Sequence, residues 1–232
     1  MQILEFISPI MLHTTLNPQL WNGDQVKEPV RLKLLAHARE FIKSWDLDAV
    51  PLRDIVLTGS MTNLTYTPAS DLDLHIIVDM DKIYGGGSLV ENFLDAKRRL
   101  WNKTYDVELF GTPVEVYVED DDETVRGNKY SLMTNEWLVR EPLKDTQYDD
   151  RSVRAKYGYL TRHLTRILDR ADSVDDLDRV MRKLKQYRQS GLDQHGEFST
   201  ENLVFKSLRN NGWLERIQEL RVTLTNKSLS LD

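Results

Sequence analysis

The segment IVLTGSMTNLTYTPASDLDLHIIVD, residues 55–79, places turn residues between two apolar runs. The first run covers residues 55–57 and stops at Gly59-Ser60, and after ten further residues Asp71-Leu72-Asp73 opens a second run that ends at Val78. Short apolar runs bounded by glycine and polar residues are typical of buried strands. The segment therefore predicts a strand, a turn and a second strand, with polar side chains at both junctions.

Two acidic residues open the second strand. Side chains alternate faces in an extended strand, so Asp71 and Asp73 project from the same side, about 7 Å apart along it. Two carboxylates this close repel each other, and a cation between them removes the repulsion. Carboxylate oxygens suit Mg²⁺ or Mn²⁺ far better than zinc. The pair therefore predicts a divalent metal site.

The other junction, Gly59-Ser60, has the composition of a phosphate-binding turn. Glycine adopts backbone angles that other residues avoid, and its missing side chain lets a ligand approach the main chain. Ser60 adds a hydroxyl and a backbone N–H at the expected start of a short helix, where phosphate oxygens are favoured. We expect Gly59 and Ser60 to bind a triphosphate whose metal ions lie at Asp71 and Asp73. The same residues also occur in ordinary turns and strand entrances, and that alternative stays open.

Gly-Ser followed by Asp-x-Asp at this distance resembles the nucleotidyltransferase superfamily of the DNA polymerase beta type. The resemblance implies a small mixed sheet with flanking helices, a nucleoside triphosphate such as ATP as substrate, and Mg²⁺ or Mn²⁺ as cofactor. It also implies a third carboxylate, which lies after the Asp-x-Asp on a neighbouring strand in a short apolar-acid-apolar pattern.

Residues 106–119, DVELFGTPVEVYVE, predict a β-hairpin with its turn at Gly111-Thr112. In its second arm valines alternate with acidic or aromatic residues, so one face is apolar. The resemblance assigns the third catalytic and metal-binding carboxylate to Glu115, in Val-Glu-Val, although many relatives have Asp at this position. Glu108, in Val-Glu-Leu, has the same local pattern and remains the alternative.

Helical periodicity accounts for most of the remaining chain. Apolar residues recur at helical spacing over residues 26–45 and again over residues 89–102. From Ser152 onward the pattern is helical, with helix starts at Ser173 and at Ser199 or Thr200, and a last helix over residues 214–224. A break is expected between Gly191 and Gly196, and a helix end near Gly212. The predicted fold class is α+β. Residues 1–150 would form a nucleotidyltransferase domain with a small mixed β-sheet and flanking helices, and residues 151–232 a C-terminal helical bundle.

The formal net charge of −6 is unevenly distributed. Residues 1–150 carry 15 Lys and Arg against 26 Asp and Glu, a net of −11, whereas residues 151–232 carry 16 against 11, a net of +5. An acidic first part suits a metal-binding module, and a basic second part suits contact with phosphates. In the second part we expect Lys156 and Arg162 to contact the bound nucleotide. The acidic run EDDDE, residues 119–123, is interpreted as a solvated loop tip without a role.

The sequence contains no cysteine, which excludes disulfides, thiolate metal sites and cysteine nucleophiles and is compatible with the cytoplasm. No apolar run approaches the roughly 20 residues needed to cross a membrane, so no membrane partner is expected. The apolar start carries Glu5 and no basic leader, so we do not expect a signal peptide. Residues 196–213, GEFSTENLVFKSLRNNGW, together with the motif region resemble nucleotidyltransferases of tailed-phage genomes, which would place the protein in the host cytoplasm.

From these residues we expect a Mg²⁺-dependent nucleotidyltransferase that transfers a nucleoside monophosphate to an acceptor hydroxyl and releases pyrophosphate. The acceptor stays open between an RNA end, a nucleotide, a protein and a small molecule, and so do the preferred base and the oligomeric state. The alternative is a catalytically inactive protein of the same fold that binds a nucleotide or nucleic acid.

Overall fold

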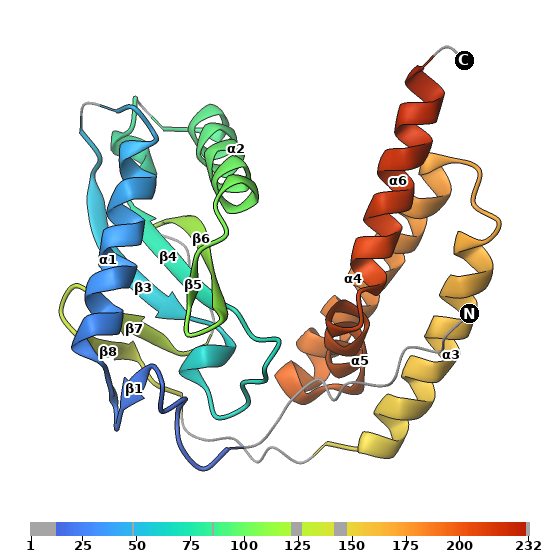
Figure 1. Cartoon of the computed structure of the whole chain (residues 1–232), viewed down its shortest axis with the longest axis horizontal. Coiled ribbons are helices and arrows are strands. Elements are labelled where there is room, and N and C mark those ends of the chain that lie inside the picture. Colours follow the sequence, from blue (N-terminus) through green and yellow to red (C-terminus); the bar gives the residue numbers. More distant parts are fainter. Residues whose placement is uncertain (1–12, 48, 85, 122–126, 142–147, 231–232) are drawn as a thin grey trace. The chain divides into compact units, whose positions relative to one another are not determined.

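The computed structural model describes residues 13–47, 49–84, 86–121, 127–141 and 148–230. Its contacts divide the chain into two compact units, one containing residues 11–144 and the other residues 1–10 and 145–232. The first unit is built on a β-sheet and the second from helices (Figure 1). The predicted boundary at residue 150 stays a prediction, because residues 142–147 lie outside the described chain.

The sheet of the first unit has the strand order β5-β6-β4-β3-β7-β8 (Figure 1). Its strands are β3 (Leu52–Thr58), β4 (Leu72–Val78), β5 (Glu108–Leu109), β6 (Thr112–Asp120), β7 (Lys129–Ser131) and β8 (Glu136–Val139). β4 pairs with β6 in parallel, and the other neighbouring strands are antiparallel. A parallel pair needs a crossover connection, and α2 (Ser88–Thr104) lies between β4 and β6 in the chain. This mixed sheet with its helices confirms the predicted α+β class.

One face of the sheet forms a hydrophobic core with α1 (Glu28–Lys43) and α2. Alternate residues of β4 point into it, as the period of two requires, and Leu72, Leu74 and Ile76 are 0% exposed. Ala38 and Phe41 of α1 meet them from the helix side and are equally buried. Burial of each large apolar side chain stabilises the fold by roughly 1.5–3 kcal/mol, so this face is the main source of stability of the unit.

α2 confirms the helix predicted over residues 89–102, but much of its apolar surface faces solvent. Val90 and Leu94 are buried in the core. Leu89, Phe93 and Leu100, from which the helix was predicted, expose 81%, 37% and 64% of their surface. Helical spacing alone therefore identified the helix and not the side on which it packs.

Asn102, near the end of α2, lies along the outer edge of β6. Its side-chain amide donates to the carbonyl oxygen of Val116 (3.0 Å) and accepts from the N–H of the same residue (3.1 Å). The unpaired backbone groups of an edge strand are thereby satisfied. The predicted hairpin is present beside this point, with Gly111 at its turn in a left-handed conformation (φ 76°).

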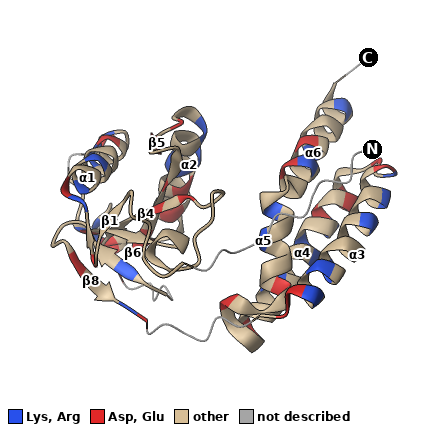
Figure 2. Ribbon diagram, turned by 60° about the horizontal axis from the view of Figure 1, so that its bottom comes forward, with Lys and Arg blue, Asp and Glu red and all other residues tan. Residues whose placement is uncertain are grey.

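The second unit consists of α3 (Asp150–Leu168), α4 (Val174–His195), α5 (Thr200–Asn210) and α6 (Trp213–Leu229) in its described part. Ser173 and Ser199 accept hydrogen bonds from backbone N–H groups three residues later, which confirms both as helix N-caps. Leu203, Val204 and Leu208 of α5 lie in the core of this unit. Lys and Arg side chains are spread along α3 and α4 among acidic ones (Figure 2).

The break predicted between Gly191 and Gly196 begins later than expected, because Gly191 lies inside α4, which continues to His195. A Cβ atom built on Gly191 would lie 2.5 Å from the Cβ of Glu201 and 2.7 Å from the Oγ of Ser199. This glycine therefore lets α4 approach the start of α5 closely. The helix ends at Gly196, whose φ is 71°. α6 continues to Leu229, past the predicted end at residue 224.

The interpretation of residues 119–123 as a solvated tip is wrong for Glu119 and Asp120, whereas Asp121 is exposed and lies in a turn as expected. Glu119 and Asp120 belong to β6, and the carboxylate of Glu119 is buried against Nδ1 of His75. Asp121 pairs with the guanidinium of Arg53 at 2.8 Å. β6 continues past its alternating valines into the acidic run. A run of acidic residues by itself does not indicate a strand. Residues 122 and 123 lie outside the described residues.

Two short hairpins were not predicted. One is formed by β1 (Trp21–Asn22) and β2 (Gln25–Val26), and the other by β7 and β8. Trp21 stacks on Trp137 of β8 with ring centroids 5.2 Å apart, so side-chain packing joins the two hairpins. None of the helices in the described part of the chain has the length and apolar character needed to cross a membrane.

Candidate active site

The pairing of three strands places two of the predicted carboxylates side by side. Asp73 of β4 lies opposite Thr58 of β3 on one side and opposite Glu115 of β6 on the other. Residues opposite each other in neighbouring strands project from the same face, about 5 Å apart at the backbone. Asp73 and Glu115 are both half-buried, on the face away from α1 and α2.

Asp71 joins this pair from the entrance of β4. It lies two residues before Asp73 and so shares its face. The phenol of Tyr117 lies near all three acids. Burial raises the pKa of Tyr117 far above its usual range, its hydrogen bond to Glu115 raises the pKa further, and the charges of Asp73 and Asp71 add to the effect. Three negative charges thus act on one hydroxyl, which stays protonated and remains a donor.

Gly59 brings the backbone bend against Asp73. A Cβ atom built on Gly59 would lie only 1.8 Å from Oδ2 of Asp73, and the residue has φ 75° and ψ −160°. Those angles belong to a region that essentially only glycine occupies. Both the close approach and the backbone conformation therefore require glycine. The bend faces the acidic residues, and Ser60 follows it as the first residue of the 3₁₀ turn η1 (Ser60–Thr62).

Side chains from other parts of the unit hold this bend in place. The carbonyl oxygen of Gly59 accepts hydrogen bonds from Oγ1 of Thr62 (2.7 Å) and Nδ2 of Asn63 (2.9 Å). Asn128 donates to the carbonyl oxygen of Thr62 at 2.7 Å, and the indole of Trp21 donates to that of Met61 at 3.0 Å. The sequence analysis missed these supporting residues, since Trp21 and Asn128 are distant in the chain and no local pattern marks them.

Glu108, the alternative third carboxylate, lies one strand further from β4 than Glu115. It belongs to β5 and pairs with Pro113 of β6. It is exposed, and no described strand pairing places it opposite either aspartate. The register thus places Glu115, and not Glu108, beside Asp73.

The three acids supply six hard oxygen atoms at one end of β4 and β6, a donor set that fits Mg²⁺ or Mn²⁺ and does not fit zinc. Among the described residues, no three acidic or histidine side chains are already drawn together at metal-binding distances. Glu115 is instead hydrogen-bonded to Tyr117 (2.6 Å).

Lys156 and Arg162, the predicted cationic contacts, lie on α3 of the second unit. Lys156 donates to Glu201 at 2.7 Å, and this hydrogen bond raises the pKa of its ammonium group. Arg162 is exposed. A contact of either side chain with a bound nucleotide stays a prediction.

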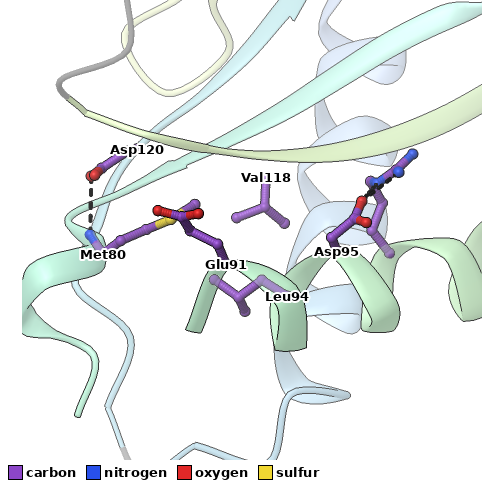
Figure 3. A pocket seen from close by; sticks show the side chains of 7 residues that line it. Met80, Glu91, Leu94, Asp95, Val118 and Asp120 are labelled. Carbon is purple, nitrogen blue, oxygen red and sulfur yellow. Dashed lines mark hydrogen bonds and ion pairs between the residues drawn. The ribbon is translucent and has the colours of Figure 1, made fainter. Parts of the chain in front are cut away.

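A pocket between α2, β6 and the 3₁₀ turn η2 (Met80–Lys82) is distinct from the acidic site (Figure 3). Val118 and Asp120 line it, and the period of two places them on the face of β6 opposite Glu115. Asp120 accepts a hydrogen bond from the N–H of Met80 (3.1 Å), and Asp95 pairs with Arg98. These acids already have partners, and we assign the pocket no role.

Comparison with known proteins links this geometry to a family. Residues 38–141 match the model of the nucleotidyltransferase domain, a region that contains the Gly-Ser bend and all three strand acids. No curated protein matches the chain. A solved structure, the STING-associated CdnE c-di-GMP synthase from Capnocytophaga granulosa, matches over 88% of this chain and 84% of its own, with 11% identity and a TM-score of 0.24. A likeness that weak carries no argument here. The match of residues 38–141 to the nucleotidyltransferase domain model supports the enzyme class expected from the sequence, that of a nucleotidyltransferase.

Proposed function

We propose that this protein transfers a nucleoside monophosphate from a nucleoside triphosphate to an acceptor hydroxyl. The observation that carries the proposal is the register that sets Asp73 beside Glu115, with the bend at Gly59 directly against Asp73. Phosphate-binding backbone and metal-binding carboxylates are thus within one site. Nucleotidyl transfer, like other transfers of phosphorus groups, requires both.

Asp71, Asp73 and Glu115 would hold Mg²⁺ or Mn²⁺. When bound, the cation would neutralise charge on the triphosphate and lower the pKa of the acceptor hydroxyl. Gly59 lets the backbone of the bend lie directly against the Asp73 carboxylate, and the hydroxyl of Ser60 can donate to a phosphate oxygen. The acceptor oxygen attacks the α-phosphorus in line and forms the new P–O bond, while the bond to the bridging oxygen breaks. Pyrophosphate leaves, and the acceptor proton passes to solvent.

The helical unit would supply cationic contacts to the nucleotide through Lys156 and Arg162. Support comes from the net charge of +5 over residues 151–232 and from the partial exposure of both side chains. Replacing both residues by alanine should weaken nucleotide binding, measured by calorimetry on the full chain. Unchanged affinity would remove both residues from the proposal. Lys183→Ala on α4 is a suitable control, since it removes an exposed positive charge from the same unit.

The proposal includes four classes of acceptor. An RNA end, a nucleotide, a protein or a small molecule each supplies the required hydroxyl. The resemblance to enzymes of tailed-phage genomes and a cytoplasmic location stay predictions. Intact-mass measurement of candidate acceptors after reaction would identify the substrate, because each transferred nucleotide adds a fixed mass.

Incubation with each labelled nucleoside triphosphate and Mn²⁺ tests whether the protein catalyses nucleotidyl transfer. Transfer of label should require the intact pair, so the Asp71→Ala/Asp73→Ala protein should be inactive. Label transfer by both proteins would refute the assigned site. Nucleotide binding without transfer by the wild type, across all acceptor classes, would favour the inactive binding protein.

The same assay separates the two candidate third carboxylates. Glu115→Gln should lose transfer, whereas Glu108→Gln, which removes a similar charge one strand away, should keep it. The opposite result would assign the third carboxylate to Glu108.

A further inference from the structure

Tyr117 is tied directly to Glu115. Both residues lie on β6 two positions apart, so their side chains project from the same face. The hydroxyl of Tyr117 donates a hydrogen bond to Oε2 of Glu115 at 2.6 Å. That distance is typical of a hydroxyl that donates to an ionised carboxylate, and such charge-assisted hydrogen bonds are stronger than neutral ones.

Glu115 needs such a partner more than the two aspartates do. A glutamate side chain has an additional rotatable bond, and fixing it at a metal site costs rotamer entropy. Its neighbour in register, Asp73, carries the same charge and pushes its carboxylate away. A donor that holds one oxygen offsets both effects and leaves the other oxygen for a cation.

The ring of Tyr117 is itself fixed from its surroundings. The imidazole of His75, opposite it on β4, stacks on it with ring centroids 4.8 Å apart and planes inclined by 20°. Nδ1 of His75 is in turn bound by the buried carboxylate of Glu119. The guanidinium of Arg98 lies over the Tyr117 ring at 5.3 Å. A phenol held in this way can aim its hydroxyl in one direction.

We propose that Tyr117 is a positioning residue that holds the Glu115 carboxylate in place and thereby sets the affinity of the acidic site for a divalent cation. The proposal rests on the proposed function, because it takes Glu115 as a metal ligand. Partners that orient metal-binding carboxylates change metal affinity by roughly 10–100-fold when they are removed. The hydroxyl acts through Glu115 and touches neither nucleotide nor acceptor.

The test measures Mn²⁺ binding to the full chain without nucleotide, by the electron paramagnetic resonance signal of free Mn²⁺. Tyr117→Phe keeps the stacking ring and loses only the hydroxyl, and it should weaken binding by about tenfold or more. Tyr105→Phe is the control, since it removes the hydroxyl of a half-exposed tyrosine whose ring packs against Trp101, away from the acids. Equal affinities of wild type and Tyr117→Phe would overturn the proposal.

A double-mutant cycle tests whether the hydroxyl acts through Glu115. Aspartate at position 115 is one methylene shorter and does not reach the phenol, so Tyr117→Phe should have no further effect in a Glu115→Asp protein. An equal loss in both backgrounds would overturn the proposal. If Tyr117→Phe lacked the cooperative thermal unfolding of the wild type, Tyr117→Leu, which also has no donor, would take its place under the same criterion.

Asp73→Ala distinguishes this proposal from the function on which it rests. If Asp73→Ala binds Mn²⁺ as the wild type does, the metal site itself is refuted. If Asp73→Ala loses Mn²⁺ while Tyr117→Phe retains it, only the role of Tyr117 is refuted.

Discussion

The two faces of β4 differ in burial and in charge. Leu72, Leu74 and Ile76 point to one side and are completely buried, whereas Asp71 and Asp73 point to the other and remain partly open to solvent. One strand therefore serves stability through its even-numbered residues and, in the proposed function, catalysis through its odd-numbered ones. The buried face fixes the register that brings the acids together, and the acids themselves add repulsion to the folded state.

This contrast predicts opposite responses to substitution on the two faces. Changes among the acids should remove activity and leave the free energy of unfolding unchanged or higher. Changes on the apolar face should lower the free energy of unfolding and leave the chemistry of the remaining folded protein intact.

The largest effect is expected for Asp73→Asn. Loss of a shared metal ligand should lower the rate of nucleotidyl transfer at least about 1,000-fold, equivalent to ~4 kcal/mol of transition-state stabilisation. The melting temperature should not fall, because a repelling charge has been neutralised. Initial rates and thermal melts measure the two quantities. Asp81→Asn, an exposed acid of η2, is the control that should change neither. A parallel loss of rate and melting temperature would mean that Asp73 has a structural role.

Leu74→Ala should have the next largest effect, on stability. Its side chain is fully buried in the core, so truncation should lower the free energy of unfolding by about 3 kcal/mol and the melting temperature by roughly 10 °C. Urea unfolding followed by circular dichroism gives the free energy. Below the melting transition the transfer rate should equal that of the wild type. A variant that stays stable but loses activity would contradict the division between the two faces.

Gly59→Ala should be more damaging than Gly111→Ala, although both residues have nearly the same φ, 75° and 76°. Alanine at a positive φ costs about 1–3 kcal/mol of stability. Only at Gly59 would the new methyl group also meet the Asp73 carboxylate, since nothing lies within 4 Å at Gly111. Transfer should therefore fall at least about 100-fold in Gly59→Ala, ~2.7 kcal/mol, and persist in Gly111→Ala. Equal rates in the two variants would show that Asp73 can move aside at no cost.

The smallest effect is expected at His37, on the helix layer over the apolar face. The indole of Trp101 donates to Nε2 of His37 at 2.8 Å, and burial lowers the pKa of the imidazole. A lowered pKa in the folded state means that the unfolded chain takes up the proton more readily. Stability from this group is therefore complete above about pH 6.5 and is lost as pH falls below it, by at most about 1.4 kcal/mol per pH unit.

Urea unfolding at pH 7.5 and 5.5 measures that loss. His37→Gln can still accept from Trp101 and cannot titrate, so it should be less sensitive to acid than the wild type. His163→Gln on exposed α3 is the control and should match the wild type. Identical pH profiles for all three proteins would exclude a contribution of His37.

Local patterns in the sequence predicted the elements that carry their own signal. The strands on either side of Gly59-Ser60, the helices over residues 26–45 and 89–102, and the caps at Ser173 and Ser199 are all present in the structure. Each is defined within about one turn or one strand by spacing, glycine or a capping side chain. The β1–β2 and β7–β8 hairpins are too short for a period to emerge, and packing of Trp21 on Trp137 stabilises them.

The candidate site was predictable to the extent that it is local. Asp71 and Asp73 share a strand face because of the period of two, which sequence alone provides. Only the pairing of β4 with β6 distinguishes Glu115 from Glu108. The role proposed for Tyr117 likewise depends on the residues that this pairing places around it, which the sequence does not show. Glu119 was assigned to a loop for the same reason, because its partner His75 is brought near by the parallel register.

The side-chain amide of Asn102 imitates a neighbouring strand along β6. These contacts favour a single register of β6. A slip by one residue would break both hydrogen bonds of the Asn102 amide and turn Glu115 towards the hydrophobic core. The same amide occupies the places where the backbone of a foreign polypeptide would add to the sheet. Asn102 of α2 thus helps to fix the register that sets Glu115 beside Asp73. It also blocks this part of the sheet edge from pairing with a strand of another molecule.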